Sequence, residues 1–292
     1  MEEDMVTLGR MTLANPIVAA SGALGFGRGY WWDRPLIYAG IIEPDSVGAV
    51  ITKTLTSMRR VGNWKGWNPW QVLWPLRGGW VNAFGLTNGG LDWFIMNEYA
   101  QTHHDNLIVS ITDPDPANII SMVRRLDRLD ILAIEINLSC PNTPEWVCLQ
   151  CEANITRELF SRARQETRHP LIAKIGYLPA TQRERIAEAL DTADAVDMIN
   201  TIPYGNRFPG KMSPLKKGGG VSGPLVRQHA LEQVGWFARN THLPIIGGGG
   251  VCSADDAQNF INAGASAVSV GSAHIMRPWV STHLATHYTW AH

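Results

Sequence analysis

The stretch of sequence that decides the fold is ILAIEINLSCPNTP, residues 131–144. It begins as an apolar run typical of a β-strand and ends abruptly in two asparagines, a serine and a cysteine, close to two prolines. Because proline fixes φ and restricts the residue before it, the thiol of Cys140 is held where the strand stops. The pattern indicates a buried strand that presents functional groups at its carboxyl end.

Similar apolar runs recur along the chain and alternate with amphipathic helical stretches. Nearly continuous apolar strands are expected where both faces of a parallel sheet are covered. Eight such units predict an α/β fold, a single (β/α)8 TIM barrel domain over residues 1–292. An open doubly wound sheet is the alternative, but GALGFG (residues 22–27) lacks the G-x-G-x-x-G spacing of its usual dinucleotide site. The predicted strands are 17–20, 48–53, 107–111, 132–137, 171–175, 195–200, 243–247 and 267–271, and the predicted helices are 118–129, 155–167, 181–192, 224–241 and 254–263.

Composition limits the classes of function. Apolar residues make up 45% and charged residues 17% of the chain, as in globular proteins. A net charge of −1 provides no basic field for nucleic acid or for an anionic membrane surface. No apolar run approaches the roughly 18 residues of a membrane span, and the acidic start does not resemble a signal peptide. Four cysteines form no disulfide framework, so we expect a reduced, cytoplasmic protein.

Two patterns suggest metal ligands only weakly. Cys148 and Cys151 have a ligand-like spacing, but a closed site needs four ligands. His283 and His287 are four residues apart in a helical segment, where a solvated helix face explains them. We therefore predict no metal site.

Glycines follow the last two predicted strands, at residues 247–250 and at Gly271, which precedes Ser272. Glycine lets backbone N–H groups approach an anion, and a helix that begins just afterwards adds its positive dipole end. In (β/α)8 barrels these two loops are the usual phosphate site. A flexible turn would explain one glycine run, but two runs at the expected positions favour phosphate binding.

Taken together, the ordered motifs resemble the dihydroorotate dehydrogenase family, flavin enzymes of pyrimidine (UMP) biosynthesis. The resemblance extends from about residue 8 to residue 276 and is carried by many motifs in order rather than by any one of them. The matching motifs are LANP (13–16), ASG (20–22), GFG (25–27), ITK (51–53), VNAFGLTN (81–88), INLSCPN (136–142), AK (173–174), INT (199–201), GGVSGP (219–224) and the two glycine sites.

The resemblance implies that FMN is bound at the carboxyl ends of the strands. Lys174 ends an apolar strand, where an ammonium without a partner is expensive. A flavin that gains negative charge would give this ammonium a partner, although an ion pair with a neighbouring carboxylate is the alternative. The residues implied to bind the cofactor are Ala20, Ser21, Gly22, Lys53, Thr54, Asn137, Lys174, Thr201 and Gly223, with the phosphate on Gly249, Gly250, Gly271 and Ser272.

The implied reaction is the oxidation of dihydroorotate to orotate. The resemblance makes Cys140 the base that removes the C5 proton while the C6 hydride goes to the flavin, with Lys53 and Lys174 assisting. A thiol can act as a base where nearby donors favour the thiolate. Orotate offers a carboxylate for a lysine and backbone N–H groups, and a ring edge that asparagine amides can read. The residues implied to bind substrate are Lys53, Asn82, Phe84, Gly85, Leu86, Asn137, Asn142, Asn200 and Thr201.

Cys140 points to the Cys-base branch of the family, in which one class is a homodimer that reduces fumarate. The other class uses NAD through an electron-transfer subunit carrying FAD and an iron–sulfur cluster. GGVSGP and INT look more like the NAD-linked class, so we expect such a partner around a homodimeric core. The departures from the family pattern are Ser110, Pro203, Tyr204, the loop after Pro144 and the tryptophans of residues 64–80.

Two rival functions remain from the sequence. A related FMN enzyme could act on another dihydropyrimidine. A flavin-free barrel lyase or aldolase could use Lys174 as a Schiff-base nucleophile and the glycine sites for a substrate phosphate.

Overall fold

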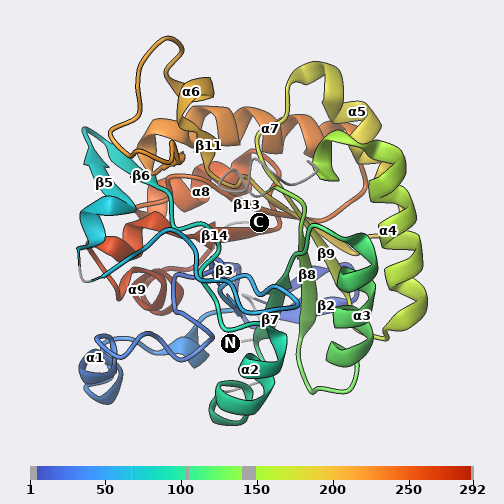
Figure 1. Ribbon diagram of the computed structural model, residues 1–292, viewed down its shortest axis with the longest axis horizontal. Helices are drawn as coiled ribbons and strands as arrows, with labels where there is room; N and C mark the ends of the chain where they lie inside the picture. The colour runs from blue at the N-terminus through green and yellow to red at the C-terminus, as the bar shows by residue number, and fades with distance from the viewer. Residues whose placement is uncertain (1–4, 67, 103–104, 140–148, 291–292) are drawn as a thin grey trace.

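Eight parallel strands form a closed barrel in the computed structural model, which describes residues 5–66, 68–102, 105–139 and 149–290. All eight predicted strands are present, and neighbours pair in the order β10-β13-β14-β3-β4-β7-β8-β9. The (β/α)8 prediction is therefore confirmed, and the open sheet is excluded (Figure 1). The barrel strands are β3 (Ile17–Ala19), β4 (Ala49–Ile51), β7 (Leu107–Ile111), β8 (Ala133–Asn137), β9 (Leu171–Ile175), β10 (Ala195–Met198), β13 (Ile245–Gly248) and β14 (Ala267–Val270).

Helices cover the outside of the barrel, as α3 illustrates. Asp115 caps its N-terminus by accepting a hydrogen bond from the Ala117 amide, and Pro116 occupies the first turn, where no N–H is needed. Ile119 and Val123, four residues apart, are buried on the face toward the strands. All five predicted helices are present. The helices are α1 (Arg34–Tyr38), α2 (Leu91–Asn97), α3 (Pro116–Leu126), α4 (Ala153–Glu166), α5 (Ala180–Ala189), α6 (Tyr204–Arg207), α7 (Arg227–Asn240), α8 (Ala254–Asn262) and α9 (Val280–His287).

A hairpin that we did not predict closes the end of the barrel where the strands begin. Strands β1 (Val6–Leu8) and β2 (Met11–Leu13) pair antiparallel, and their apolar side chains join the lowest layer inside the barrel. This layer is entirely apolar, with residues such as Ile108, Ile172 and Ile246 from different strands. The barrel floor is therefore a packed core, and any site must lie above it.

A second feature missed from the sequence is a four-stranded antiparallel sheet on the loop side. It joins β5 (Leu73–Leu76) and β6 (Gly79–Asn82), which follow β4, to β11 (Ile202–Pro203) and β12 (Gly220–Ser222), which follow β10. Its central pair is β6 with β12, in which Asn82 lies opposite Gly220. Figure 1 shows β5, β6 and β11 gathered at one edge of the molecule. Two loops far apart in sequence are thus joined into one structure.

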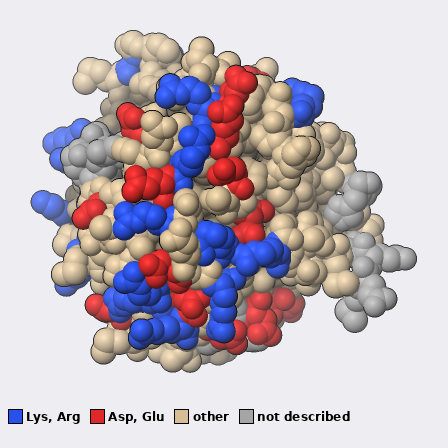
Figure 2. Space-filling model, turned by 90° about the vertical axis from the view of Figure 1, so that its right-hand side faces the viewer, with Lys and Arg blue, Asp and Glu red and all other residues tan. Residues whose placement is uncertain are grey.

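The surface over the outer helices carries mixed charge. On the face drawn in Figure 2, lysine and arginine side chains alternate with aspartate and glutamate, and no single sign covers a broad area. One exposed example is the ion pair between Arg124 and Glu166. Within the described residues, no helix combines the length and the apolarity that a membrane crossing would need.

Candidate active site

The predicted site residues gather at the end of the barrel where the strands finish. Those that the structure describes come from the carboxyl ends of β3, β4, β8, β9, β10, β13 and β14 and from the four-stranded sheet. Cys140 and Asn142 lie outside the described residues, so the proposed base and one substrate ligand stay predictions. The other predicted residues form four neighbouring groups around the barrel mouth.

The first group is a cradle of glycines. Gly250 has φ +93°, and a Cβ placed on it would lie 2.6 Å from the carbonyl oxygen of Gly223. A Cβ on Gly223 would in turn lie 3.7 Å from the Ser272 hydroxyl, and one on Gly271 would lie 3.4 Å from the Ala20 Cβ. Gly249 also has a positive φ of +129°. Side chains larger than that of glycine would fill this cradle. Because the residues are glycines, the backbone stays accessible to a ligand.

An arginine that we did not predict fixes this cradle. The Arg227 guanidinium donates from Nε and Nη2 to the carbonyl oxygen of Gly250, at 3.0 and 2.6 Å. Its Nη1 lies 2.6 Å from Asp256, whose other carboxylate oxygen accepts from the Cys252 amide. Both ends of the turn after β13 are therefore tied to α7 and α8.

The second group surrounds Lys53, directly after β4. Its amide donates to the Gly25 carbonyl, and its ammonium lies 5.5 Å from the centre of the Phe84 ring. Among the residues that the structure describes, no carboxylate lies within ion-pair distance of this ammonium. Burial lowers the pKa of Lys53 below its usual value. Lys53 is thus a partly buried cation with no anionic partner in the described part of the chain.

The turn beside Lys53 carries free backbone donors. Gly85 and Leu86 both have positive φ, +71° and +58°, so the chain turns here in the left-handed region and leaves the strand conformation of β6. In the described part of the chain, none of the amides of Phe84, Gly85 and Leu86 donates a hydrogen bond. The contact between the Phe84 ring and the Lys53 ammonium brings this turn close to Lys53. Together they form a site suited to a small carboxylate.

The third group contains the asparagines. Asn137 accepts from the Ser139 amide and donates to the Thr54 hydroxyl. Asn200 donates to the carbonyl of Ser139 at 2.5 Å and accepts from the amide of Thr201. The ends of β8 and β10 are therefore joined by asparagine side chains, which these contacts hold in fixed orientations. Asn82 lies at the end of β6, opposite Gly220.

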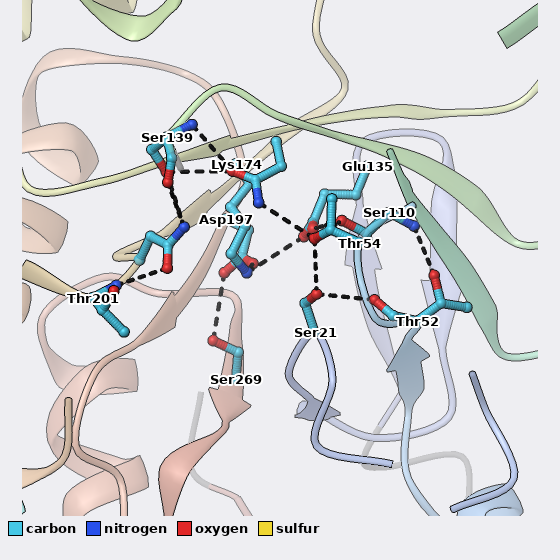
Figure 3. Close-up of polar contacts among 12 residues, drawn as sticks. Ser21, Thr52, Thr54, Ser110, Glu135, Ser139, Lys174, Asp197, Thr201 and Ser269 are labelled. Atoms are coloured by element: carbon cyan, nitrogen blue, oxygen red, sulfur yellow. Dashed lines mark hydrogen bonds and ion pairs between the residues drawn. The ribbon is translucent and has the colours of Figure 1, made fainter. Parts of the chain in front are cut away.

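The fourth group is a polar layer inside the barrel, directly above its apolar floor (Figure 3). Lys174 of β9 lies opposite Asp197 of β10, and its ammonium is 2.5 Å from the Asp197 carboxylate. The same ammonium is 3.7 Å from Glu135 of β8. The alternative considered from the sequence, an ion pair between Lys174 and a neighbouring carboxylate, is therefore what the structure contains. A role of Lys174 toward a cofactor stays a proposal.

Burial and charge shift the pKa values in this layer strongly. Burial by itself lowers the pKa of Lys174, but the carboxylates of Asp197 and Glu135 outweigh it and hold that pKa above its usual range. Burial raises the pKa of Glu135 to about 8, helped by Asp197 and opposed by Lys174. One ammonium compensates one carboxylate, and the other carboxyl keeps its proton.

Hydroxyl groups connect this layer to the barrel mouth. Ser110 of β7 donates to Glu135 at 2.6 Å and lies 2.9 Å from the Thr54 hydroxyl. Thr54 lies 3.1 Å from Ser21, which is partly exposed at the end of β3. Figure 3 shows this row of side chains running from Ser21 toward Glu135. Ser110, singled out in the sequence as a departure from the family pattern, is thus part of the site.

Sequence reasoning missed Glu135 and Asp197, although both left a signal. Each is a charged residue in the middle of a fully buried apolar strand. A charge at such a position almost always has a partner or a function. The identity of the partner depends on strand register, which the sequence does not show.

Of the remaining departures, the loop after Pro144 and Trp67 lie outside the described residues, and the others lie in the four-stranded sheet and its surroundings. Pro203 ends β11 and Tyr204 begins α6, where its ring packs on Phe208. Trp74 is in β5 and packs edge-on against Trp70, and both are substantially exposed. Within the described residues, no cluster of histidine, cysteine, aspartate and glutamate side chains has the arrangement of a metal site.

Comparisons with known proteins agree with this geometry. Residues 5–287 match the family model described as dihydroorotate dehydrogenase. The NAD(+)-linked dihydroorotate dehydrogenase B catalytic subunit of Thermodesulfovibrio yellowstonii is 32% identical over 286 residues, covering 94% of this chain and 88% of the relative. The same subunit of Desulforudis audaxviator is 33% identical, covering 96% and 89%.

Solved structures support the fold. A ligand-free dihydroorotate dehydrogenase from Eimeria tenella superposes with a TM-score of 0.79 at 22% identity, over 98% of this chain and 86% of that chain. The family model covers nearly the whole sequence, and the barrel agrees with it. The chain therefore belongs to the dihydroorotate dehydrogenase family and is an oxidoreductase of that family.

Proposed function

We propose that the chain oxidises dihydroorotate to orotate with FMN as its cofactor. The observation that carries the proposal is the pairing of Lys53, a cation with no carboxylate partner among the described residues, with the free amides of residues 84–86. A substrate carboxylate would satisfy both, because it accepts from an ammonium and from backbone N–H groups at once. A neutral pyrimidine would leave the ammonium without an anion.

The glycine cradle fits the phosphate of FMN. Its donors are backbone amides at Gly249, Gly250 and Gly271 and the Ser272 hydroxyl, and a Cβ at Gly250 would collide with Gly223. The remaining ligands of the cofactor would be Ala20, Ser21, Gly22, Thr54, Asn137, Lys174 and Thr201.

The residues of the chain divide the chemistry among them. FMN, when bound, supplies the acceptor for the hydride that leaves C6 of dihydroorotate. Lys53 and the 84–86 amides would hold the substrate carboxylate, and Asn82, Asn137, Asn142 and Asn200 its ring edge. Cys140 would remove the C5 proton from the opposite face, a role that rests on the family resemblance. The fixed orientation of Asn137 and Asn200 means that little order is lost when the substrate binds.

We further propose that electrons leave toward NAD through a separate electron-transfer subunit. The support is the name of the relatives at 32% and 33% identity, which are catalytic subunits of the NAD(+)-linked enzyme. Co-expression of the chain with such a subunit, followed by an assay of NADH formation from dihydroorotate, tests this part alone. A homodimeric core stays a prediction that solution mass measurement can check.

The decisive experiment is the visible spectrum of the purified chain before and after anaerobic addition of dihydroorotate. We expect a yellow protein that bleaches rapidly, and a Cys140→Ala variant that remains yellow after the same addition. A yellow wild-type protein that ignores dihydroorotate would redirect the substrate search to other dihydropyrimidines. A colourless protein that takes up no added FMN would overturn the proposal.

A further inference from the structure

Two carboxyl groups share one lysine inside the barrel, and the charge of this layer depends on a single proton. Lys174 lies 2.5 Å from Asp197 but 3.7 Å from Glu135. The Glu135 side chain is fully buried, and its Oε2 has no hydrogen-bond partner among the residues that the structure describes. With Glu135 protonated the three groups carry no net charge, and with Glu135 ionised they carry one negative charge.

The neighbours of Glu135 give an ionised carboxylate little support. Ser110 of β7 donates one hydrogen bond, and Lys174 of β9 is committed to Asp197 of β10. Behind these groups lie Thr54, next to Ser110, and Ser269 of β14, next to Asp197. Burial, together with the negative charge of Asp197, outweighs the ammonium of Lys174 at 3.7 Å and the hydrogen bond from Ser110, so Glu135 keeps its proton more firmly than a free carboxyl group does.

A route for that proton leads to the barrel mouth. The hydroxyls of Ser110, Thr54 and Ser21 follow one another at 2.9 and 3.1 Å, and Ser110 is 2.6 Å from Glu135. A hydroxyl both donates and accepts, so the row can pass a proton in either direction. In the other direction the apolar floor and its β1–β2 hairpin separate the layer from water.

The same mouth is where the proposed cofactor would bind. Ser21, Thr54, Asn137 and Lys174 are among its proposed ligands, and they adjoin Glu135 through the contacts above. A negative charge gained there would act on Glu135 across a region with little water, where electrostatic interactions are strong. The gain of charge would therefore favour the protonated form of Glu135.

We propose that Glu135 is a redox-linked proton-binding residue: in alkaline solution, where it is ionised in the oxidised enzyme, its carboxylate takes up one proton from water, through Ser110, Thr54 and Ser21, when the cofactor at Lys174 gains electrons. Only an O–H bond on Glu135 forms, and the proton comes from solvent at the mouth. The inference rests on the proposed FMN function. It assigns to Glu135 no part in removing the C5 proton of the substrate.

The test is the midpoint potential of the bound FMN measured from pH 6 to pH 10. In the wild type we expect the potential to fall more steeply with pH above about pH 8, where Glu135 is ionised in the oxidised enzyme. The added slope is one proton per two electrons, about 30 mV per pH unit. The Glu135→Gln variant, which cannot ionise, should lack the added slope.

Two further variants keep the test decisive. Asp197→Asn removes the competing negative charge, so the steeper region should begin at a lower pH than in the wild type. Glu166→Gln makes the same chemical change in an exposed ion pair with Arg124. The midpoint potential of this variant should have the same pH dependence as that of the wild type. If Glu135→Gln proves too unstable to purify, the proposal is tested by Asp197→Asn alone, from the direction in which this variant shifts the pH where the steeper region begins.

The outcomes separate this inference from the proposed function. A yellow protein that dihydroorotate reduces, but whose potential has the same pH slope in the wild type and in Glu135→Gln, would overturn the inference alone. So would an Asp197→Asn variant whose slope changes at the wild-type pH or above it. A chain that takes up no FMN would overturn both.

Discussion

Lys53 and Lys174 lie at the same end of one barrel, yet their surroundings are opposite. Lys174 is enclosed by two carboxyl groups, and these hold its pKa above the usual range. Lys53 has an aromatic ring and free backbone amides beside it, and burial lowers its pKa. The first cation is neutralised by carboxylates, whereas the second has no carboxylate within ion-pair distance among the described residues. Residue type alone therefore does not tell a lysine that the protein neutralises from one that it leaves without a carboxylate.

The largest effect is expected from removing Lys174. The Lys174→Met variant leaves Asp197 as a buried carboxylate without its cation, which should lower the free energy of unfolding by about 3–5 kcal/mol. Denaturant unfolding at neutral pH with constant added FMN measures it. The double variant Lys174→Met/Asp197→Leu should recover much of the loss, because no uncompensated charge remains. A loss below about 1 kcal/mol in the single variant would show that the ion pair contributes little.

Removing Lys53 should affect catalysis instead of stability. In Lys53→Met we expect kcat/KM for dihydroorotate to fall on the order of 100-fold or more, because the substrate carboxylate loses its cation. The free energy of unfolding should not fall by more than about 0.5 kcal/mol, since no carboxylate of the described residues pairs with Lys53 and burial disfavours its charged form. Steady-state kinetics and denaturant unfolding of one preparation test both. A stability loss as large as that of Lys174→Met would erase the contrast between the lysines.

The pH dependence of stability should sharpen the contrast. Because burial lowers the pKa of folded Lys53, the unfolded chain binds more protons between that pKa and the usual value near 10.5. The stability of the wild type relative to Lys53→Met should therefore rise as the pH increases through this window. Unfolding curves for both proteins at several pH values up to about 10.5 measure it. A difference that falls with rising pH would mean that Lys53 is paired in the folded protein.

The smallest effect is expected at the edge of the Lys174 network. Ser269 donates a long hydrogen bond of 3.4 Å to Asp197, so Ser269→Ala should cost less than about 1 kcal/mol of unfolding free energy. Calorimetric or denaturant unfolding detects a change of this size. A cost near that of Lys174→Met would mean that Asp197 depends on Ser269 for its position.

The barrel could be predicted because its signals are local. Each barrel strand is a short apolar run closed by glycine or a polar residue, and each predicted helix has its own periodicity. The hairpin β1–β2 was also readable, since residues 6–13 alternate apolar and polar around Gly9 and Arg10. Strand β12 could not be predicted from the sequence. Its three residues form a strand only by pairing with β6, which is over a hundred residues away along the chain.

In the candidate site, too, some residues can be placed from the sequence alone and others cannot. Lys53 and the glycine cradle follow strand ends, so position along the chain indicates their place at the mouth. The pairing of Lys174 with Asp197 follows from the register of β9 and β10, and Glu135 joins them from a third strand. The sequence shows that three charged residues are buried, but only the closed barrel shows that they meet.

The sheet that joins β6 to β12 has a consequence for how the two loops can evolve. Asn82, a proposed substrate ligand, lies opposite Gly220, three residues before the cradle residue Gly223. The loops after β4 and β10 therefore share backbone hydrogen bonds, and neither can change length or register without the other. Along this lineage the two loops should vary together as one module. In a chimaera that takes one of these loops from a relative and keeps the other, β6 and β12 would come from different proteins and would no longer be matched to pair with each other.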